Sequence, residues 1–180
     1  AHKHVRSEKD VFSIEAMIRN NVLHAKRLLD YLKQNKPSHF FCVSTDKAAN
    51  PVNVMGGSKK LMENVIMSYS KDIKITTARF ANVAFSNGSL LFGYIERLLK
   101  RQPISCPSDV ERFFVSPEES GEICLITCIL GNSGDIYFPK LSEDGLINFK
   151  KITEDFFKFL GKDIKICTDE YEAKEYAMNI

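Results

Sequence analysis

A short apolar run, Phe40-Phe41-Cys42-Val43-Ser44, constrains the fold more than any other part of this sequence. It combines aromatic and β-branched residues without a charge, which is typical of a strand buried on both faces of a parallel sheet. Apolar residues recur at helical spacing from Val11 to Lys33, where Asp10 or Ser13 can cap the helix start. A second helix is expected after Pro51. The run is therefore predicted to be a strand between two helices.

The alternation of helix and strand continues through the rest of the chain. The second helix is expected to bury one apolar face, made of Leu61, Met62, Val65, Ile66 and Tyr69. Further strands are expected over 73–80, 135–138 and 164–167, and further helices over 90–100, 116–130, 149–160 and in the tail after Thr168. This order is typical of βαβ units with a parallel sheet, so the predicted fold class is α/β.

The composition excludes several classes of protein. The 25 Lys and Arg nearly balance the 23 Asp and Glu, for a net charge of +2, which argues against nucleic-acid binding as the main activity. No apolar run approaches the roughly 20 residues that span a bilayer, and no signal-peptide pattern opens the chain. The five Cys have no paired CxxC spacing, which indicates buried thiols in a reducing compartment. We therefore expect a cytoplasmic location.

The segment from Ser44 to Lys59 carries the side chains that are able to take part in a reaction. Thr45, Asp46 and Lys47 follow the predicted strand directly, and open α/β sheets bind ligands at the carboxyl ends of their strands. A hydroxyl, a carboxyl and an amine side by side form a plausible donor, acid and base set. Met55 and Lys59 share one face of the next helix. The alternative is a polar loop whose side chains only cap backbone groups, and composition alone favours neither.

This segment resembles the active-site region of the extended short-chain dehydrogenase/reductases. The resemblance is closest to the polysaccharide-biosynthesis branch, which contains nucleotide-sugar 4,6-dehydratases acting on N-acetylglucosamine nucleotides. Further similar segments occur in the family's order and cover most of Ala1 to Leu141: Ala1–Glu8, Asn20–Val22, Ala78–Val83, Ser86–Ser89 and Glu111–Ser116. The resemblance implies a Rossmann-like doubly wound parallel sheet with a small substrate-binding lobe. Residues 1–85 would form the catalytic half, and 86–180 mainly the lobe with interleaved Rossmann elements.

The resemblance also implies catalytic roles. Asp46 would protonate the departing C6 hydroxyl, Lys47 would remove the C5 proton, and Thr45 would hydrogen-bond near the C4 oxygen. A lysine base must be neutral when it acts, so Lys47 needs a lowered pKa. Lys59 would contact the nicotinamide ribose. The wider superfamily has Tyr where this chain has Met55, so Asp46 or a water held by Thr45 is expected to accept the C4 proton.

Binding roles follow from the same resemblance. Ser44, Met55 and Lys59 are expected at the cofactor, and Asn21 is expected to support the site. For the substrate, the expected contacts are Lys3, Asn82 and Arg112, the last through a bidentate diphosphate contact. The alternative for Arg112 is a surface ion pair with Glu111 or Glu118. His2 and His4 are spaced like a metal-binding pair, but no further ligands accompany them, so no metal is expected.

The expected cofactor is NAD or NADP, although no GxGxxG or GxxGxxG motif occurs in the chain. We therefore expect a fragment that lacks the opening half of the sheet. The expected function is a nucleotide-sugar 4,6-dehydratase, with UDP-N-acetylglucosamine as the first substrate to test. The alternatives are a nucleotide-sugar epimerase of the same superfamily and a non-catalytic Rossmann-like interaction domain. A homo-oligomer is expected, with 11–33 and 54–69 as candidate pairing helices.

Overall fold

The computed structural model describes residues 8–104, 106, 109–142, 145–167 and 169–178. The chain forms two compact units, Ala1–Ala81 with Glu118–Lys140, and Asn82–Pro117 with Leu141–Ile180. The first unit holds a parallel sheet of β1 (Phe40–Thr45), β2 (Ile75–Phe80) and β6 (Ile136–Tyr137), in the order β1-β2-β6. Phe40 pairs with Ile75 and Thr45 with Phe80, so β1 and β2 end together.

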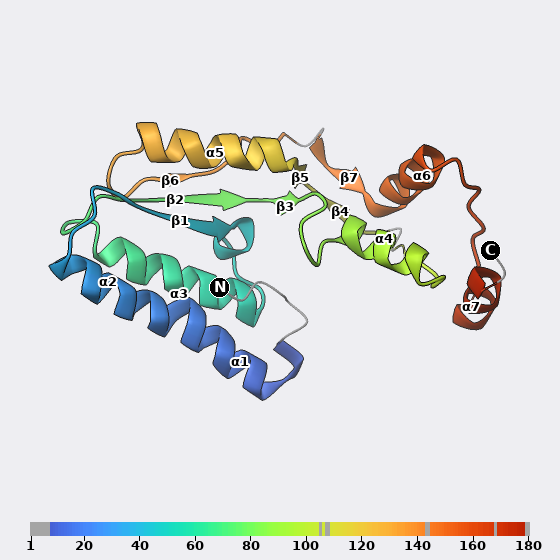
Figure 1. Ribbon diagram of the computed structural model, residues 1–180, viewed down its shortest axis with the longest axis horizontal. Coiled ribbons are helices and arrows are strands. Elements are labelled where there is room, and N and C mark those ends of the chain that lie inside the picture. The colour runs from blue at the N-terminus through green and yellow to red at the C-terminus, as the bar shows by residue number, and fades with distance from the viewer. Residues whose placement is uncertain (1–7, 105, 107–108, 143–144, 168, 179–180) are drawn as a thin grey trace. The chain divides into compact units, whose positions relative to one another are not determined.

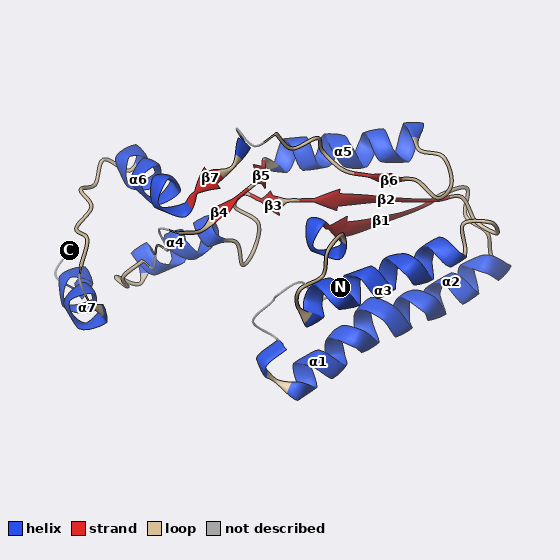
Figure 2. Cartoon of the chain, turned by 180° about the vertical axis from the view of Figure 1, so that it is seen from behind, coloured by secondary structure: helices blue, strands red, loops and turns tan. Residues whose placement is uncertain are grey.

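Helices cover both faces of this sheet. The helices α1 (Val11–Ile18), α2 (His24–Gln34) and α3 (Val54–Ser68) lie on one face, and α5 (Pro117–Leu130) lies on the other, as Figures 1 and 2 show. Between α3 and the sheet lies a buried apolar cluster, formed by Leu29, Met62, Ile66, Ile73 and Ile75. The predicted α/β class with a doubly wound parallel sheet is therefore confirmed.

The first helical segment differs from the uniform helix expected over Val11 to Lys33. Asp10 caps α1 by accepting a hydrogen bond from the Ser13 backbone N–H, at 2.9 Å. Between α1 and α2 the backbone widens into a π-helical stretch, Arg19–Leu23. Such stretches often occur at functional sites. Apolar periodicity did not reveal it, because one widened turn leaves the pattern on either side nearly intact.

Three local expectations are wrong. The strand β1 is not buried on both faces, since Val43 is 47% exposed and no described strand pairs with the outer edge of β1. The central strand β2 has that character instead, with five of its six residues buried. Leu61 is half exposed on α3 rather than on its inner face. Residues 164–167 form no strand, because no described strand offers them a partner.

Among its described residues, the second unit contains short strands and three helices. The strand β3 (Asn82–Val83) pairs in parallel with β5 (Phe114–Val115), and β4 (Glu111–Arg112) pairs antiparallel with β7 (Ile147–Asn148). The helices are α4 (Leu90–Leu99), α6 (Phe149–Phe159) and α7 (Glu170–Met178). Buried Tyr94 links α4 to α6, because its hydroxyl lies 2.8 Å from Thr153 Oγ1 and its ring packs on Phe156. The functional division at residue 85 stays a prediction.

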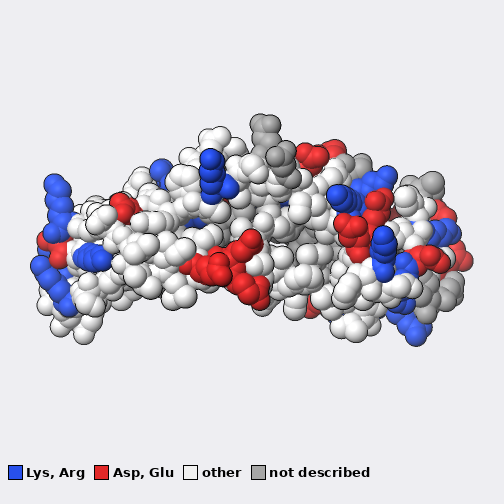
Figure 3. Space-filling model, turned by 90° about the horizontal axis from the view of Figure 1, so that it is seen from above, with Lys and Arg blue, Asp and Glu red and all other residues white. Residues whose placement is uncertain are grey.

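The surface over α5 is mostly neutral. Figure 3 shows this side of the molecule, where a group of acidic side chains stands out on a largely uncharged middle part and no continuous basic stripe is in view. The exposed residues of α5 include the acidic first turn, Glu118 and Glu119, and an apolar group of Leu125, Ile126, Ile129 and Leu130. No described helix is long and apolar enough to cross a membrane.

Candidate functional site

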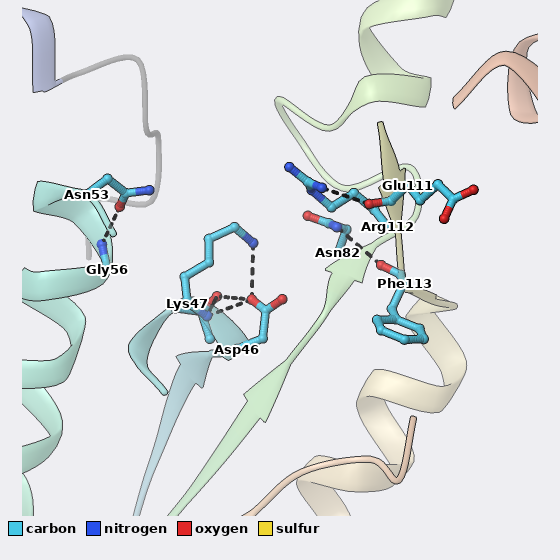
Figure 4. A network of polar contacts seen from close by, with 9 residues as sticks. Asp46, Lys47, Asn53, Gly56, Asn82, Glu111, Arg112 and Phe113 are labelled. Carbon is cyan, nitrogen blue, oxygen red and sulfur yellow. Dashed lines mark hydrogen bonds and ion pairs between the residues drawn. The ribbon is translucent and has the colours of Figure 1, made fainter. Parts of the chain in front are cut away.

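Thr45, Asp46 and Lys47 form a contact cluster where β1 ends. The strand stops at Thr45 and continues as a 3-10 turn, Asp46–Ala48. Asp46 Oδ1 accepts hydrogen bonds from Thr45 Oγ1 at 2.8 Å, from the Lys47 backbone N–H at 2.8 Å and from Lys47 Nζ at 3.1 Å. Figure 4 shows the Asp46–Lys47 contacts. These side chains do cap the turn, as the alternative interpretation expected. The Lys47 ammonium also contacts the Asp46 carboxylate, so a proton can pass directly between these two side chains.

The start of α3 holds this turn in place. Asn53 caps the helix by accepting a hydrogen bond from the Gly56 N–H at 2.8 Å (Figure 4), and Glu8 Oε2 accepts one from the Val54 N–H at 2.9 Å. A Cβ added at Gly56 would lie only 2.7 Å from the Lys47 carbonyl oxygen. Only glycine lets the helix approach the turn this closely. The backbone that carries Asp46 and Lys47 is therefore fixed by the first turn of α3.

Lys59 is buried on the same helix. The residue is 7% exposed, and burial lowers the pKa of its ammonium, while nearby Cys42 and Glu63 act in the opposite direction. Burial likewise raises the pKa of the neighbouring Cys42 thiol. Among the described residues, Lys59 Nζ has no hydrogen-bond or ion-pair partner. Burying a charged residue without such a partner costs stability. Met55, one turn earlier, is buried as well.

Ser44 and Asn21 are buried polar residues of the same unit as Lys59. Ser44 Oγ is buried and has no partner within hydrogen-bond geometry among the described residues. It nevertheless lies close enough to Glu63 to help lower the pKa of that carboxyl. Asn21, in the π-helical stretch, is fully buried and donates to Ser58 Oγ at 3.0 Å. Ser58 in turn donates to the Met55 carbonyl at 2.8 Å. Asn21 thereby ties the first helical segment to α3 next to Lys59.

Sequence reasoning missed the ion pair between Glu63 and Arg79. Arg79 Nε lies 2.9 Å from Glu63 Oε1 and Arg79 Nη2 lies 2.6 Å from Oε2. Burial would raise the pKa of Glu63, but the hydrogen bonds and charge of Arg79 hold it below its ordinary value. One signal was available. Glu63 interrupts the apolar stripe of α3 one turn after Lys59, and Arg79 interrupts an otherwise apolar and hydroxyl-bearing strand.

Asn82 and Arg112 belong to the second unit. Asn82 donates its backbone N–H and its side-chain Nδ2 to the Phe113 carbonyl, at 3.3 and 3.2 Å. Arg112 is exposed and donates from Nη1 to the Glu111 backbone carbonyl at 2.7 Å (Figure 4). The expected alternative, an ion pair with the carboxylate of Glu111 or Glu118, is absent among the described residues. This contact leaves most of the guanidinium facing solvent.

The last candidates are the N-terminal residues and a metal site. Lys3, His2 and His4 lie outside the described residues. Within the described ranges, no group of three or more His, Cys, Asp or Glu side chains is arranged to hold a metal ion.

Comparison with known proteins identifies the family. The model of the family described as "Polysaccharide biosynthesis protein" matches residues 1–175. The capsular polysaccharide biosynthesis protein CapD of Staphylococcus aureus is 33% identical over 141 residues, which are 76% of this chain and 23% of that protein. A UDP-glucose 4-epimerase of Rickettsia canadensis is 32% identical over 174 residues, 93% of this chain and 50% of that protein. The chain thus spans half or less of the length of these two relatives.

Solved structures agree on the fold. Pen from Bacillus thuringiensis superposes with a TM-score of 0.79 at 24% identity, over 92% of this chain and 53% of that one. DesIV, a dTDP-glucose 4,6-dehydratase from Streptomyces venezuelae, gives a TM-score of 0.77 at 18% identity, over 91% and 56%. At these identities the likeness shows a shared Rossmann-type fold. With a family match that covers nearly the whole sequence, this chain belongs to the polysaccharide biosynthesis protein family.

Proposed function

We propose that the protein containing this chain is a nucleotide-sugar 4,6-dehydratase that converts UDP-N-acetylglucosamine into a 4-keto-6-deoxy sugar. The observation that carries this proposal is the contact cluster of Thr45, Asp46 and Lys47, in which one carboxylate oxygen meets both a hydroxyl and an ammonium. Water elimination across C5 and C6 needs an acid and a base on adjacent atoms. Two neighbouring residues in direct contact meet that need.

The two charged side chains take complementary roles. Lys47 removes the C5 proton, which a C4 ketone makes acidic, and Asp46 protonates the departing C6 hydroxyl. Lys47 returns this proton to C5 as C6 is reduced, so the pair, held in contact at 3.1 Å, regains its starting protonation after each turnover. General acid–base assistance of this kind contributes roughly 100- to 10,000-fold in rate.

Oxidation at C4 needs a different base in this chain. The thioether of Met55 is buried and cannot accept a proton. Asp46 therefore accepts the C4 hydroxyl proton, directly or through a water held by Thr45, and later passes it to the C6 oxygen. The hydrogen bond from Thr45 Oγ1 to Asp46 supports this order, because it holds the carboxylate beside the hydroxyl that is to contact the C4 oxygen.

The first unit fits the ribose end of a nicotinamide dinucleotide. The unpaired ammonium of Lys59 and the buried hydroxyl of Ser44 suit a ligand that presents hydroxyl groups, and Asn21 supports their backbone through Ser58. When bound, the dinucleotide takes a hydride from the sugar and returns it. NAD is the better first choice, because the DesIV structure is described with NAD bound.

The second unit supplies groups for the nucleotide end of the substrate. Arg112 offers a guanidinium that is free to bind a diphosphate with two parallel hydrogen bonds. Asn82 keeps its side-chain oxygen for the same ligand while its Nδ2 bonds the Phe113 carbonyl. Lys3 is assigned to the sugar or phosphate from the resemblance alone.

The test uses the full-length protein with NAD and UDP-N-acetylglucosamine. A dehydratase yields a product lighter by one water, detected by mass spectrometry. Lys47→Met and Asp46→Asn should abolish this product while nucleotide binding, measured by calorimetry, persists. Lys71→Met, an exposed lysine of the same unit, is the matched control. Normal turnover by Lys47→Met would overturn the assignment.

An epimerase is the second candidate, because the Rickettsia canadensis relative is named UDP-glucose 4-epimerase. An epimerase changes the configuration of the sugar without changing its mass, so nuclear magnetic resonance of the product separates the two activities. A non-catalytic interaction domain would give neither product and would tolerate both site variants.

We also propose that the protein pairs with a second copy through the outer faces of its first three helices. These faces expose apolar side chains that no described residue covers: Val11, Phe12, Leu23, Leu28, Tyr31 and Leu61. Light scattering of Leu28→Glu should show a smaller particle than the unmodified protein does. An unchanged monomeric mass in both would refute the pairing.

A further inference from the structure

The ion pair between Glu63 and Arg79 is the most thoroughly buried charge pair among the described residues. Glu63 lies on α3 with its side chain 2% exposed, and Arg79 lies on β2 with 15% exposed. Both carboxylate oxygens are occupied, Oε1 by Nε and Oε2 by Nη2. The two parallel hydrogen bonds orient the carboxylate toward the sheet. None of the roles proposed above uses this pair.

Glu63 is also the carboxylate that acts on Lys59. The two residues are four positions apart on α3, so their side chains emerge from the same face of the helix. Both are buried, and Glu63 is close enough for its charge to act on Lys59. A buried ammonium and a buried carboxylate at this spacing normally pair. Here they do not, because Arg79 holds both oxygens of the carboxylate.

The register of the sheet places Arg79 within reach of the Glu63 carboxylate. Ser44 pairs with Arg79 in the register of β1 and β2, and Cys42 pairs with Thr77 two residues earlier. These side chains point to the face that α3 covers, where they meet Lys59 and Glu63. Cys42 from β1 and Glu63 from α3 are the titratable groups that act on Lys59. Arg79 reaches Lys59 only through Glu63.

We propose that Arg79 is a positioning residue that keeps Glu63 away from Lys59, so that the Lys59 ammonium stays unpaired and available to a ligand. This inference rests on the proposed function for the identity of that ligand, a dinucleotide ribose. The arrangement of the three side chains stands without it. Removing Arg79 takes both hydrogen bonds of its guanidinium from the buried Glu63 carboxylate. Besides Lys60, which is only partly buried, the cation left on α3 to replace it is the Lys59 ammonium. The ammonium then turns toward Glu63, and its pKa rises.

The experiment measures Lys59 directly in the full-length protein without cofactor or sugar. Competitive labelling with acetic anhydride across a pH series, read by peptide mass spectrometry, gives the titration midpoint of each lysine. Arg79→Met should raise the midpoint of Lys59 by about one pH unit, a tenfold change in its protonation equilibrium. The double variant Arg79→Met with Glu63→Gln should return the midpoint to the original value or below, because the competing carboxylate is gone.

Dinucleotide affinity provides the second readout. Arg79→Met should weaken NAD binding about tenfold, as expected when a charged hydrogen bond to the ligand is lost, and the double variant should recover most of that loss. Arg19→Met is the matched control, because it removes an arginine from an exposed pair with Glu15 in the same unit. It should move neither readout.

Each outcome decides the proposal. A folded Arg79→Met protein whose Lys59 midpoint is unchanged would refute it, as would a double variant that recovers nothing. If Arg79→Met does not fold by circular dichroism, Arg79→Lys keeps one charge without the two-pronged contact. That variant must then shift the midpoint in the same direction, or the proposal fails. Labelling needs no substrate. A protein without dehydratase activity would therefore refute the proposed function, and the labelling result would still test the proposed role of Arg79.

Discussion

Replacing Lys59 with methionine should make the protein more stable and less active. Lys59 as a residue is only 7% exposed, and its ammonium has no hydrogen-bond or ion-pair partner among the described residues. Methionine keeps an unbranched apolar stem of similar length and removes the charge. The substitution therefore relieves a desolvation cost while preserving the packing of the stem against α3 and β1. Activity should fall because the group reserved for the ligand is lost.

The magnitude follows from the cost of a buried polar group without a partner, about 1–3 kcal/mol. For a protein of this size each kcal/mol raises the melting temperature by about 2–4 °C. The gain also depends on pH. Burial lowers the folded-state pKa of Lys59 below its ordinary value of 10.5, so the unfolded chain binds the proton more tightly. Below the folded pKa the cost is fully present. As pH rises from there toward 10.5, the original protein gains stability and the advantage of Lys59→Met shrinks.

Urea unfolding at neutral and at alkaline pH, followed by circular dichroism, measures this difference. Comparing the two proteins at each pH cancels the titration of all other groups. Lys60→Met is the matched control, because Lys60 is the next residue on α3 and is only partly buried. We expect the control to stay within about 0.5 kcal/mol. A Lys59→Met protein less stable than the original, or an advantage that does not shrink at high pH, would refute the reasoning.

Three glycine substitutions, one of them a control, give further tests of packing. Gly56→Ala should destabilise the protein by about 1–3 kcal/mol and reduce turnover, because the added Cβ would lie 2.7 Å from the Lys47 carbonyl oxygen. Gly57→Ala is the control, because its added Cβ meets nothing within 4 Å. This variant should be neutral or stabilise the protein by up to about 1 kcal/mol. Thermal melts and product assays of both variants check this, and equal behaviour would contradict the close approach. Gly131→Ala should lower the melting temperature without a specific effect on the site, because its Cβ would lie 2.7 Å from Thr76 Cγ2 between α5 and β2. A melt as high as that of the original protein would show that the helix end can shift freely.

The sequence predicted the elements whose signals are local. The strand before Thr45, the cap at Asp10 and the helix over Leu90–Leu99 all depend on residues a few positions apart, and the structure has them. The order of helices and strands was enough for the α/β class. The exposure of Val43 was not predictable in this way, because it depends on which strands lie beside β1.

The candidate site likewise has one part that the sequence predicted and another that only the tertiary structure decided. Thr45, Asp46 and Lys47 are consecutive, so the end of one strand brings them together, and the sequence alone predicted their neighbourhood. The tertiary structure decided which charges meet. Asn21 bonds Ser58 across 37 positions, and Arg79 binds Glu63 across 16, from a strand to a helix. Periodicity describes one element at a time, whereas these contacts depend on the packing of α3 against the sheet. That packing leaves Lys59 buried and unpaired.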